Sequence, residues 1–387
     1  MALGKYTFLV SDLLSGNIIS NVEISSCSWN DVRVNSGSAQ FTARLEHPTT
    51  TLANFKPWCN AIWIVKDNVI KWGGIIGNAQ RRGSSGVIQI PAMGFYEYYK
   101  ARLLRSAAGM TFGTIQRVTD IEWTAVDPFN IFKDLIDHAN SFTDGNINVG
   151  VVWSALVGTT IRQVFPTFAV KRIGDVIDQL VGRDDTGFDF YQEYSWSSNK
   201  PHCNFRLVYP AFTTSASLEL LFAPEYATTA VDSGGFSFAY KKPIARRSNI
   251  IDYDNDGTDP PITGIMVVGQ GEGNDQNTVY VQQTLGTIPL WEDTYSVKDV
   301  NDTTQLTAIG NLQLGLNGAD NTTYTVKLDP TLPPFIDDVR PGLLINMTIN
   351  HAFTQTTGTF VIDRKDVRLT KEGQELIELQ LFPVNGL

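Results

Sequence analysis

One stretch of the sequence has the residue types of a calcium-binding loop. Carboxylates alternate in Asp252-Tyr253-Asp254-Asn255-Asp256, and Gly257 follows them. A helix-flanked calcium loop ends in a bidentate Glu at its twelfth position, where this chain has Thr263. Pro260-Pro261 interrupts the stretch, and no helical pattern flanks it. We therefore expect a solvated turn; Asp252, Asp254 and Asp256 are the first place to look for a bound ion.

A glycine-rich stretch further along has the composition of a phosphate loop. Gly269-Gln270-Gly271-Glu272-Gly273 follows an apolar strand pattern. A phosphate loop needs a helix after it, because the free N–H groups and the dipole of the helix N-terminus hold the anion. The residues that follow are Asn274 to Gln276 and then another strand pattern. We predict a tight turn and no phosphate site.

The remaining candidates for chemistry are scattered. The histidines are His47, His138, His202 and His351, and no two of them lie within four residues of each other. None forms a metalloprotease motif, and the sequence has neither a Gly-x-Ser-x-Gly elbow nor a P-loop. Asp184-Asp185 and Asp337-Asp338 are neighbours, whose side chains point to opposite faces of an extended chain. We predict no catalytic, metal-binding or cofactor-binding residue, and no enzyme activity.

Four tryptophans gather in the first part of the chain: Trp29, Trp58, Trp63 and Trp72. Exposed tryptophan can stack on sugars, but a buried one contributes a large apolar area. We expect these four in a core or at an interface.

The composition favours a chain that buries much apolar surface and excludes one that grips DNA. Charged residues are 18% of the total, below the roughly 25% of typical soluble domains, and aromatic residues reach 11%. The length of 387 residues predicts several domains. A net charge of −10 does not suit a sheath around DNA phosphates, which needs clustered Lys and Arg. An acidic channel wall would still let DNA slide past, because it repels phosphate.

The cysteines and the N-terminus indicate the compartment. Cys27, Cys59 and Cys203 are odd in number and widely spaced, so they form no disulfide framework. We expect small buried apolar residues in a chain folded in a reducing compartment. The first residues lack the layout of a signal peptide, and no apolar run approaches the ~20 residues of a membrane span. We expect neither export by a signal of its own nor membrane insertion.

Strand patterns fill residues 1–105. The expected strands are 6–10, 18–24, 40–45, 61–65, 69–76 and 87–92. Asp67-Asn68 joins two of them at hairpin spacing. So many short strands predict a small barrel or sandwich.

Residues 106–235 predict an α+β domain. Asp127 caps a helix whose first turn contains Pro128, and apolar residues recur at helical spacing as far as Ala139. A second helix is expected at 168–181, ending at Gly182, and strands at 188–194 and 205–209.

Strand patterns return in 236–275 and 320–387, around an insertion at 276–319. Asp302 caps the one helix of that insertion, near 303–316. The expected strands are 236–240, 249–253, 262–268, 324–328, 343–349, 359–362 and 376–382. Gly358 to Ile362, a charged stretch and a turn at Gly373 echo Gly74 to Ile76, a basic stretch and a turn at Gly86. The echo indicates two similar β-domains, one towards each end of the chain.

These features resemble the tail hub, a minor tail protein of long-tailed (siphovirus-type) phages that infect actinobacteria. They are also similar in plan to the baseplate hub of contractile tails. The resemblance covers nearly the whole chain and is specific at Tyr6 to Val10, Ile62 to Gly77, Gly269 to Gly273, Leu306 to Leu316 and Pro333 to Phe382. In the last of these, Asp337, Arg340, Pro341 and Gly342 precede a strand.

The resemblance implies a mainly β fold with two tube-type β-barrel domains and an α+β insertion between them. The first barrel would be 1–105, the α+β domain 106–235, and the second barrel 236–275 with 320–387; residues 276–319 form the small helical insertion. Three chains would then form a homotrimer with six barrels, which joins a six-fold distal tail protein ring to a three-fold tip.

The resemblance also implies a location and partners. The protein would be a structural part of the virion, at the tail tip, after assembly in the host cytoplasm. The tape measure protein and other minor tail or tip fibre proteins would contact it, and DNA would only pass through its lumen. Some hubs carry a C-terminal peptidase or fibre, but this chain stops at Leu387. We therefore expect receptor binding or cell-wall cleavage from another protein.

Two other functions compete with the hub. A tail-associated carbohydrate-binding protein or glycoside hydrolase would need exposed tryptophan beside a carboxylate pair at catalytic separation. A β-sandwich adhesion module of a cell surface would need a signal peptide or an anchor.

Overall fold

The structure is a computed structural model. It describes residues 6–81, 86–104, 121–142, 144–165, 171–181, 187–209, 213–222, 248–256, 262–271, 275–283, 289–297, 300–317, 322–350, 355–370 and 373–383. The chain forms two compact units. Unit 1 comprises residues 1–215, 328–343 and 362–378, and unit 2 comprises 216–327, 344–361 and 379–387.

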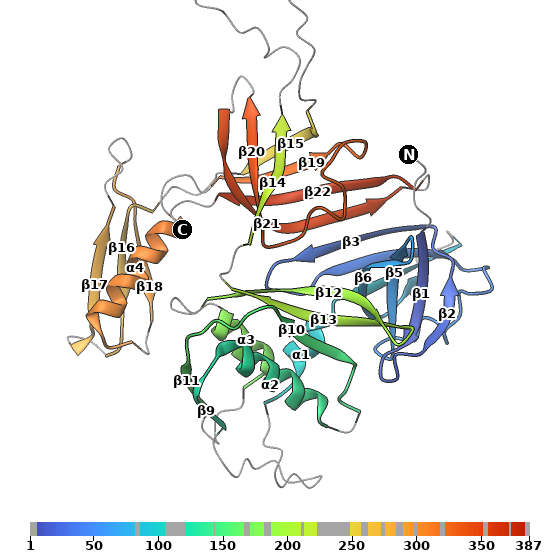
Figure 1. The fold of residues 1–387 in the computed structure, drawn as a ribbon, viewed down its shortest axis with the longest axis horizontal. Coiled ribbons are helices and arrows are strands. Elements are labelled where there is room, and N and C mark those ends of the chain that lie inside the picture. Colours follow the sequence, from blue (N-terminus) through green and yellow to red (C-terminus); the bar gives the residue numbers. More distant parts are fainter. Residues whose placement is uncertain are drawn as a thin grey trace, which may run out of the picture. The chain divides into compact units, whose positions relative to one another are not determined.

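Unit 1 is built around a large antiparallel sheet (Figure 1). Its strands are Tyr6–Asp12 (β1), Ile18–Val22 (β2), Ser26–Val32 (β3), Ser38–Arg44 (β4), Asn60–Lys66 (β5), Val69–Ile76 (β6), Gln80–Arg81 (β7), Val87–Met93 (β8) and the later part of Gln355–Leu369 (β21). They follow the order β21-β3-β4-β8-β6-β5-β1-β2, and β7 pairs with β8. All six strands expected in residues 1–105 are present.

The turn between β5 and β6 forms as predicted. Asp67 and Asn68 both have positive φ, 49° and 66°. Two-residue hairpin turns need this backbone, and Asp and Asn tolerate it better than most residues. The turn fixes the register that pairs Val69 with Lys66.

Unit 1 also contains an α+β layer. Its helices are Tyr96–Ala101 (α1), Pro128–Asn140 (α2) and Ile173–Val181 (α3), and its strands are Ile121–Val126 (β9), Val149–Trp153 (β10), Ile161–Phe165 (β11), Asp189–Ser197 (β12) and Lys200–Val208 (β13). The strands form a sheet of order β10-β13-β12 and a pair β11-β9. The N-cap of α2 is confirmed, since the Asp127 carboxylate accepts the Phe129 N–H at 2.9 Å.

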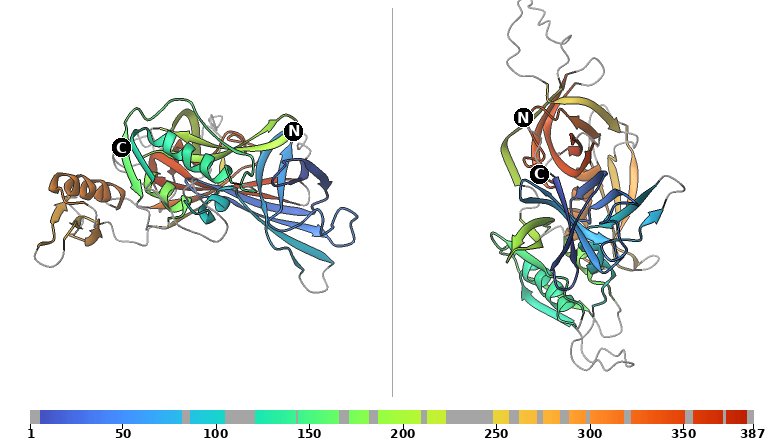
Figure 2. Two further views of the ribbon diagram at one scale, coloured as in Figure 1. Left: turned by 90° about the horizontal axis from the view of Figure 1, so that it is seen from below. Right: turned by 90° about the vertical axis from the view of Figure 1, so that its right-hand side faces the viewer.

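An aromatic core joins this layer to the large sheet. Edge-to-face contacts link Phe129 to Phe188 at 5.0 Å and Tyr96 to Phe190 at 4.9 Å between ring centroids. Trp63 of β5 lies 5.1 Å from Phe95, which precedes α1. In Figure 2 the green helices α2 and α3 lie beside the yellow-green strands β12 and β13. Many of the aromatic side chains therefore pack in the core of unit 1.

Unit 2 has a β-layer and a small α/β layer. The β-layer contains Thr213–Phe222 (β14), Ile250–Asp256 (β15), Thr323–Leu328 (β19), Leu343–Asn350 (β20), the earlier part of β21 and the later part of Glu375–Pro383 (β22), whose first residues belong to unit 1. The small layer contains Gly264–Val268 (β16), Thr278–Gln282 (β17), Glu292–Ser296 (β18) and Thr303–Asn317 (α4). Its sheet has the order β17-β16-β18. The Asp302 cap of α4 is confirmed, because its carboxylate accepts the Thr304 N–H at 2.8 Å.

The fold is mainly β, as predicted. Among the described residues, strand pairing closes no barrel in either unit, so the two barrels stay a prediction, as do the four domain boundaries. The expected strand at 236–240 lies outside the described residues. Within the described part of the chain, no helix has the length and hydropathy to cross a membrane.

Tight packing against glycine generates a first prediction. A Cβ on Gly73 would lie 2.2 Å from the Trp63 ring, whereas one on Gly358, also in a strand, meets its nearest atom at 3.6 Å. Gly73→Ala should therefore destabilise the protein by about 1–3 kcal/mol through overpacking, and Gly358→Ala by much less. Calorimetric melting of both variants checks this, and equal melting temperatures would contradict it.

Candidate functional site

The acidic stretch at 252–256 is not a turn, which corrects the sequence-based expectation. It lies in β15, and its β-branched and aromatic neighbours Ile250, Ile251 and Tyr253 favour the strand. Asp252 pairs with Lys327 of β19 at 2.8 Å. That contact lowers the pKa of Asp252 through a hydrogen bond and charge attraction. Among the described residues, no group of three or more His, Cys, Asp or Glu side chains is placed to hold a metal.

The glycine-rich stretch is a turn, as predicted, in its described part. Gly271 has φ of 119°, and the Gly269 N–H donates to the Asn277 carbonyl at 2.7 Å. Strand β17 follows from Thr278, so no helix follows the turn in sequence. Glu272, Gly273 and Asn274 lie outside the described residues.

The three described histidines lie apart, each with its own contacts. His47 pairs with Glu23 at 2.8 Å, and His138 packs edge-on to Phe142 with ring centroids 5.1 Å apart. His202 contacts Asn204 at 3.2 Å, and burial lowers its pKa. His351 lies outside the described residues, as do Asp184 and Asp185.

Three of the four tryptophans are core residues, as expected. Trp29, Trp63 and Trp72 are buried, and the Trp63 indole donates to the Ser11 hydroxyl at 2.8 Å. Trp58 differs, since it is 53% exposed and has positive φ. Cys27 and Cys203 are buried and Cys59 is half-buried, all three as free thiols.

Asp337 and Asp338 contact different groups. Asp338 accepts the Phe335 N–H at 2.8 Å inside its own turn, while Asp337 pairs with Lys71 at 2.5 Å. The Asp337 contact belongs to a larger set in unit 1, made of eight charged residues and the tyrosine on which one of them stacks, which we call the junction cluster. Its members are Asp31, Arg33, Lys71, Asp189, Tyr191, Asp337, Arg340, Asp363 and Lys365.

The most buried ion pair of the junction cluster joins β21 to β3. Lys365 Nζ lies 2.9 Å from Asp31 Oδ2, and the two side chains are 9% and 17% exposed. The same ammonium donates to the Val339 carbonyl at 3.3 Å. Because β21 and β3 pair side by side, with Lys365 opposite Asp31, the strand register itself places the charges together.

The segment from Pro333 to Gly342 is held by cations at several points. The Arg340 guanidinium stacks over the Tyr191 ring at 4.5 Å. Gly342, with φ of 79°, donates its N–H to the Ile362 carbonyl at 2.7 Å. These residues are the ones on which the sequence resemblance depended, and the structure gives them a positioning role.

Arg33 bridges two carboxylates in the same cluster. Its guanidinium lies 3.5 Å from Asp189 Oδ1 and 3.3 Å from Asp363 Oδ1. Asp189 is buried, and its second oxygen has no hydrogen-bond partner. Burial raises the pKa of Asp189 to about 6, although the attraction of Arg33 works in the opposite direction.

A cavity of about 100 Å³ lies within the junction cluster. It is lined by Asp31, Val32, Lys71, Tyr191, Gln192, Tyr194, Arg340, Pro341 and Lys365. Asp189 and Asp363 do not line it, so the two bridged carboxylates face no space there in which a substrate could bind. This arrangement supports ion pairing between strands.

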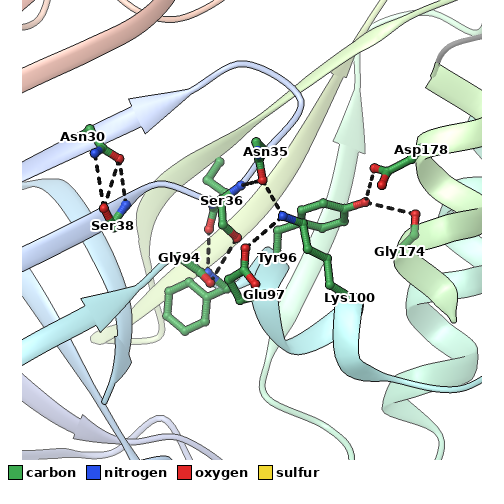
Figure 3. Close-up of polar contacts among 12 residues, drawn as sticks. Asn30, Asn35, Ser36, Ser38, Gly94, Tyr96, Glu97, Lys100, Gly174 and Asp178 are labelled. Carbon is green, nitrogen blue, oxygen red and sulfur yellow. Dashed lines mark hydrogen bonds and ion pairs between the residues drawn. The ribbon is translucent and has the colours of Figure 1, made fainter. Parts of the chain in front are cut away.

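A second polar network fixes α1 (Figure 3). Lys100 bonds Glu97 at 2.8 Å and also Asn35, in the turn after β3. The Tyr96 hydroxyl donates to Asp178 of α3 at 3.0 Å, and burial raises the pKa of that tyrosine. This network joins the large sheet to two helices, so it too is structural. Sequence reasoning missed α1, because its Tyr and Phe run also fits a strand.

Comparison with known proteins identifies the fold. No protein-family model matches the chain, and no curated protein matches its sequence. The 43 kDa tail protein of prophage MuSo2 from Shewanella oneidensis has a similar structure, with a TM-score of 0.64 and 9% identity over 98% of both chains. The tail protein from Neisseria meningitidis MC58 has a TM-score of 0.57 and 14% identity, over 97% of this chain and 96% of its own.

A chain of the Francisella PdpA-VgrG complex is also similar, with a TM-score of 0.51 and 10% identity, over 99% of this chain and 58% of its own. At these identities the comparisons show the fold, which is that of phage tail proteins. The resemblance inferred from sequence is thereby confirmed for the fold. The association with actinobacterial hosts stays a prediction.

The raised pKa of Asp189 generates a second prediction. A carboxyl group with a higher pKa in the folded protein binds its proton more tightly there, so ionisation costs stability as pH rises from about 4 to about 6. Asp189→Asn should flatten this slope and raise the free energy of unfolding at pH 7 by roughly 2–3 kcal/mol. Denaturant titrations of both proteins from pH 4 to 7 check it. Parallel curves would show that Asp189 does not cause the dependence.

The buried ion pair generates a third prediction. Lys365→Met leaves Asp31 unpaired and should destabilise the protein by about 3–5 kcal/mol, while Lys365→Met with Asp31→Leu should recover much of that loss. Lys133→Met is the matched control, because Lys133 and Asp137 form an exposed pair worth less than about 1 kcal/mol. A double-mutant cycle measures the coupling, and additive effects would contradict it.

Proposed function

We propose that the protein is a structural hub subunit of a phage tail tip and is not an enzyme. One observation carries the proposal: the likeness to the MuSo2 tail protein runs end to end, over 98% of both chains. Such coverage means that the whole chain, and not one shared module, has the tail-protein fold. The protein would be part of the virion, at the tail tip or baseplate, after assembly in the host cytoplasm.

The proposal includes two tube-type β-domains in each chain. Each unit has its own antiparallel strands. Two turns that echo each other in sequence, both within unit 1, share a backbone feature. Gly86 and Gly373 have φ of 67° and 80°, and each lies between paired strands. Positive φ at a hairpin turn favours glycine. Similar turns at corresponding places support two related modules.

Two modules per chain give a reason for a homotrimer. Three chains supply six modules, so a three-fold ring can match a six-fold distal tail protein ring. The tape measure protein and other minor tail or tip fibre proteins would be its further partners. The net charge of −10 suits a siphovirus-type channel through which DNA passes without sticking.

The charged residues support a structural role. In the junction cluster, Lys71, Lys365 and Arg33 are all within 3.5 Å of carboxylates of the same chain. Groups committed to ion pairs of this kind position segments and are not available as catalytic acids or bases. A carbohydrate-binding or glycoside hydrolase function would need a pair of carboxylates beside an exposed tryptophan such as Trp58, and among the described residues no such pair is identified.

A fourth prediction tests the oligomer. Light scattering should give a mass about three times the 42.8 kDa chain, either alone or after mixing with the distal tail protein from the same phage. Electron micrographs of that species should show a three-fold ring. A monomer under both conditions would contradict the hub, and release of sugar from cell-wall glycan would favour the hydrolase.

A further inference from the structure

Strand β18 is an open, regular edge of the small layer in unit 2. It pairs in parallel with β16 from Glu292 to Ser296 without a register shift, and among the described residues β16 is its sole partner. All five of its residues are exposed. Helix α4 packs mainly on β16 and β17 (Figure 1), and the part of the chain that the structure describes leaves β18 exposed.

The backbone of β18 has groups directed away from the sheet. The Trp291 carbonyl and the Val297 N–H both bond β16 or its extension. In a parallel ladder, alternate residues bond the neighbour on one side, so Glu292, Thr294 and Ser296 direct their backbone groups to the open side. The Thr294 N–H agrees, since it donates to the Asp293 side chain at 2.7 Å and not to a strand.

The side chains around this edge are acidic and aromatic. Among the described residues from 262 to 317, the charged side chains are Asp275, Glu292, Asp293 and Asp302, with no Lys or Arg. Trp291 and Tyr295 are 47% and 41% exposed on β18 and its start. Glu292 stays exposed, although its carboxylate accepts the hydroxyl of Tyr280 on β17 at 2.8 Å.

This pattern favours a partner of opposite charge over a second copy. Natural edges are commonly blunted by lysine, proline or a bulge, and the described residues of β18 have none of these. Pairing two copies of β18 would bring Glu292 and Asp293 of each chain close together, and like charges across strands are destabilising. A basic strand would meet complementary charge instead.

We infer that β18 is a docking edge for an extended segment of another protein that carries Lys or Arg at alternate positions with apolar residues between them. The segment would add a strand beside β18 and bond the outward groups of Glu292, Thr294 and Ser296. Its cations would pair with Glu292 and Asp293, and its apolar side chains would pack on Trp291 and Tyr295. The inference does not depend on the hub proposal.

The test uses the full chain and a synthetic probe. The probe is a blocked, fluorescent peptide of alternating lysine and valine, and anisotropy at about 150 mM salt gives its Kd. Two kinds of control peptide are needed. The first has glutamate in place of lysine. The second has the lysine–valine sequence with N-methyl groups on alternate residues, made once with the lysines methylated and once with the valines methylated. We expect binding of the first peptide and at least ~10-fold weaker binding of each control, because the controls lack charge complementarity or backbone donors.

Variants locate the site. Glu292→Gln with Asp293→Asn should weaken binding ~10-fold, since two charge pairs are lost, and Thr294→Pro should do the same by removing an outward N–H. Glu46→Gln, an exposed acid of unit 1, is the matched control and should change Kd less than ~2-fold. Circular dichroism melting checks that each variant is folded. If Thr294→Pro does not fold, the result for Glu292→Gln with Asp293→Asn decides the test.

Four outcomes would overturn the inference. These are no binding of the lysine–valine peptide, equal binding of the N-methylated peptide, equal weakening by Glu46→Gln, or concentration-dependent dimerisation of the wild type that Thr294→Pro abolishes. The second would show charge attraction without strand addition, and the last would show that the edge serves a second copy.

Discussion

The pairing of β21 with β3 is the contact on which unit 1 depends. It joins Arg364–Leu369 to Cys27–Val32, and its ion pair between Arg33 and Asp363 spans 330 residues of sequence. Closing so long a loop costs conformational entropy, and burial of the charged partners adds a desolvation cost. A slip of one residue would move Lys365 away from Asp31 and turn it to the other face. The register is therefore fixed by charge as well as by apolar burial.

The same contact decides when unit 1 can be completed. Without β21, strand β3 is an edge with unpaired backbone groups, and Asp31 loses its lysine. Tyr6 and Lys66 likewise contact Glu375 of β22, so the first and last strands share one polar contact. The N-terminal sheet therefore reaches its final state only when the C-terminal strands are present.

Local signals in the sequence predicted local structure well. The Asp127 and Asp302 caps, the Asp67-Asn68 turn and the strands of residues 1–105 follow from residue type and spacing. Strand β3 was missed because its alternation has only Cys27 and Trp29 as buried residues. The turn expected at Asp252 was wrong because Lys327 and the neighbouring strands favour an extended acidic run. The junction cluster could not be predicted, since its pairs join residues far apart in sequence.

Charge is balanced differently in the two units, as a comparison of the junction cluster with the β18 edge shows. In unit 1, the cations of the junction cluster form ion pairs with carboxylates of the same chain, which leaves that region close to neutral. These cations include Lys71, Lys365 and Arg33. The small layer of unit 2 has described carboxylates and no described cation to compensate them. Exposed charges interact over only about 8 Å at physiological salt, so such a local excess is not cancelled by cations elsewhere. The net charge of −10 therefore understates how strongly the β18 edge repels its own kind and attracts a basic strand.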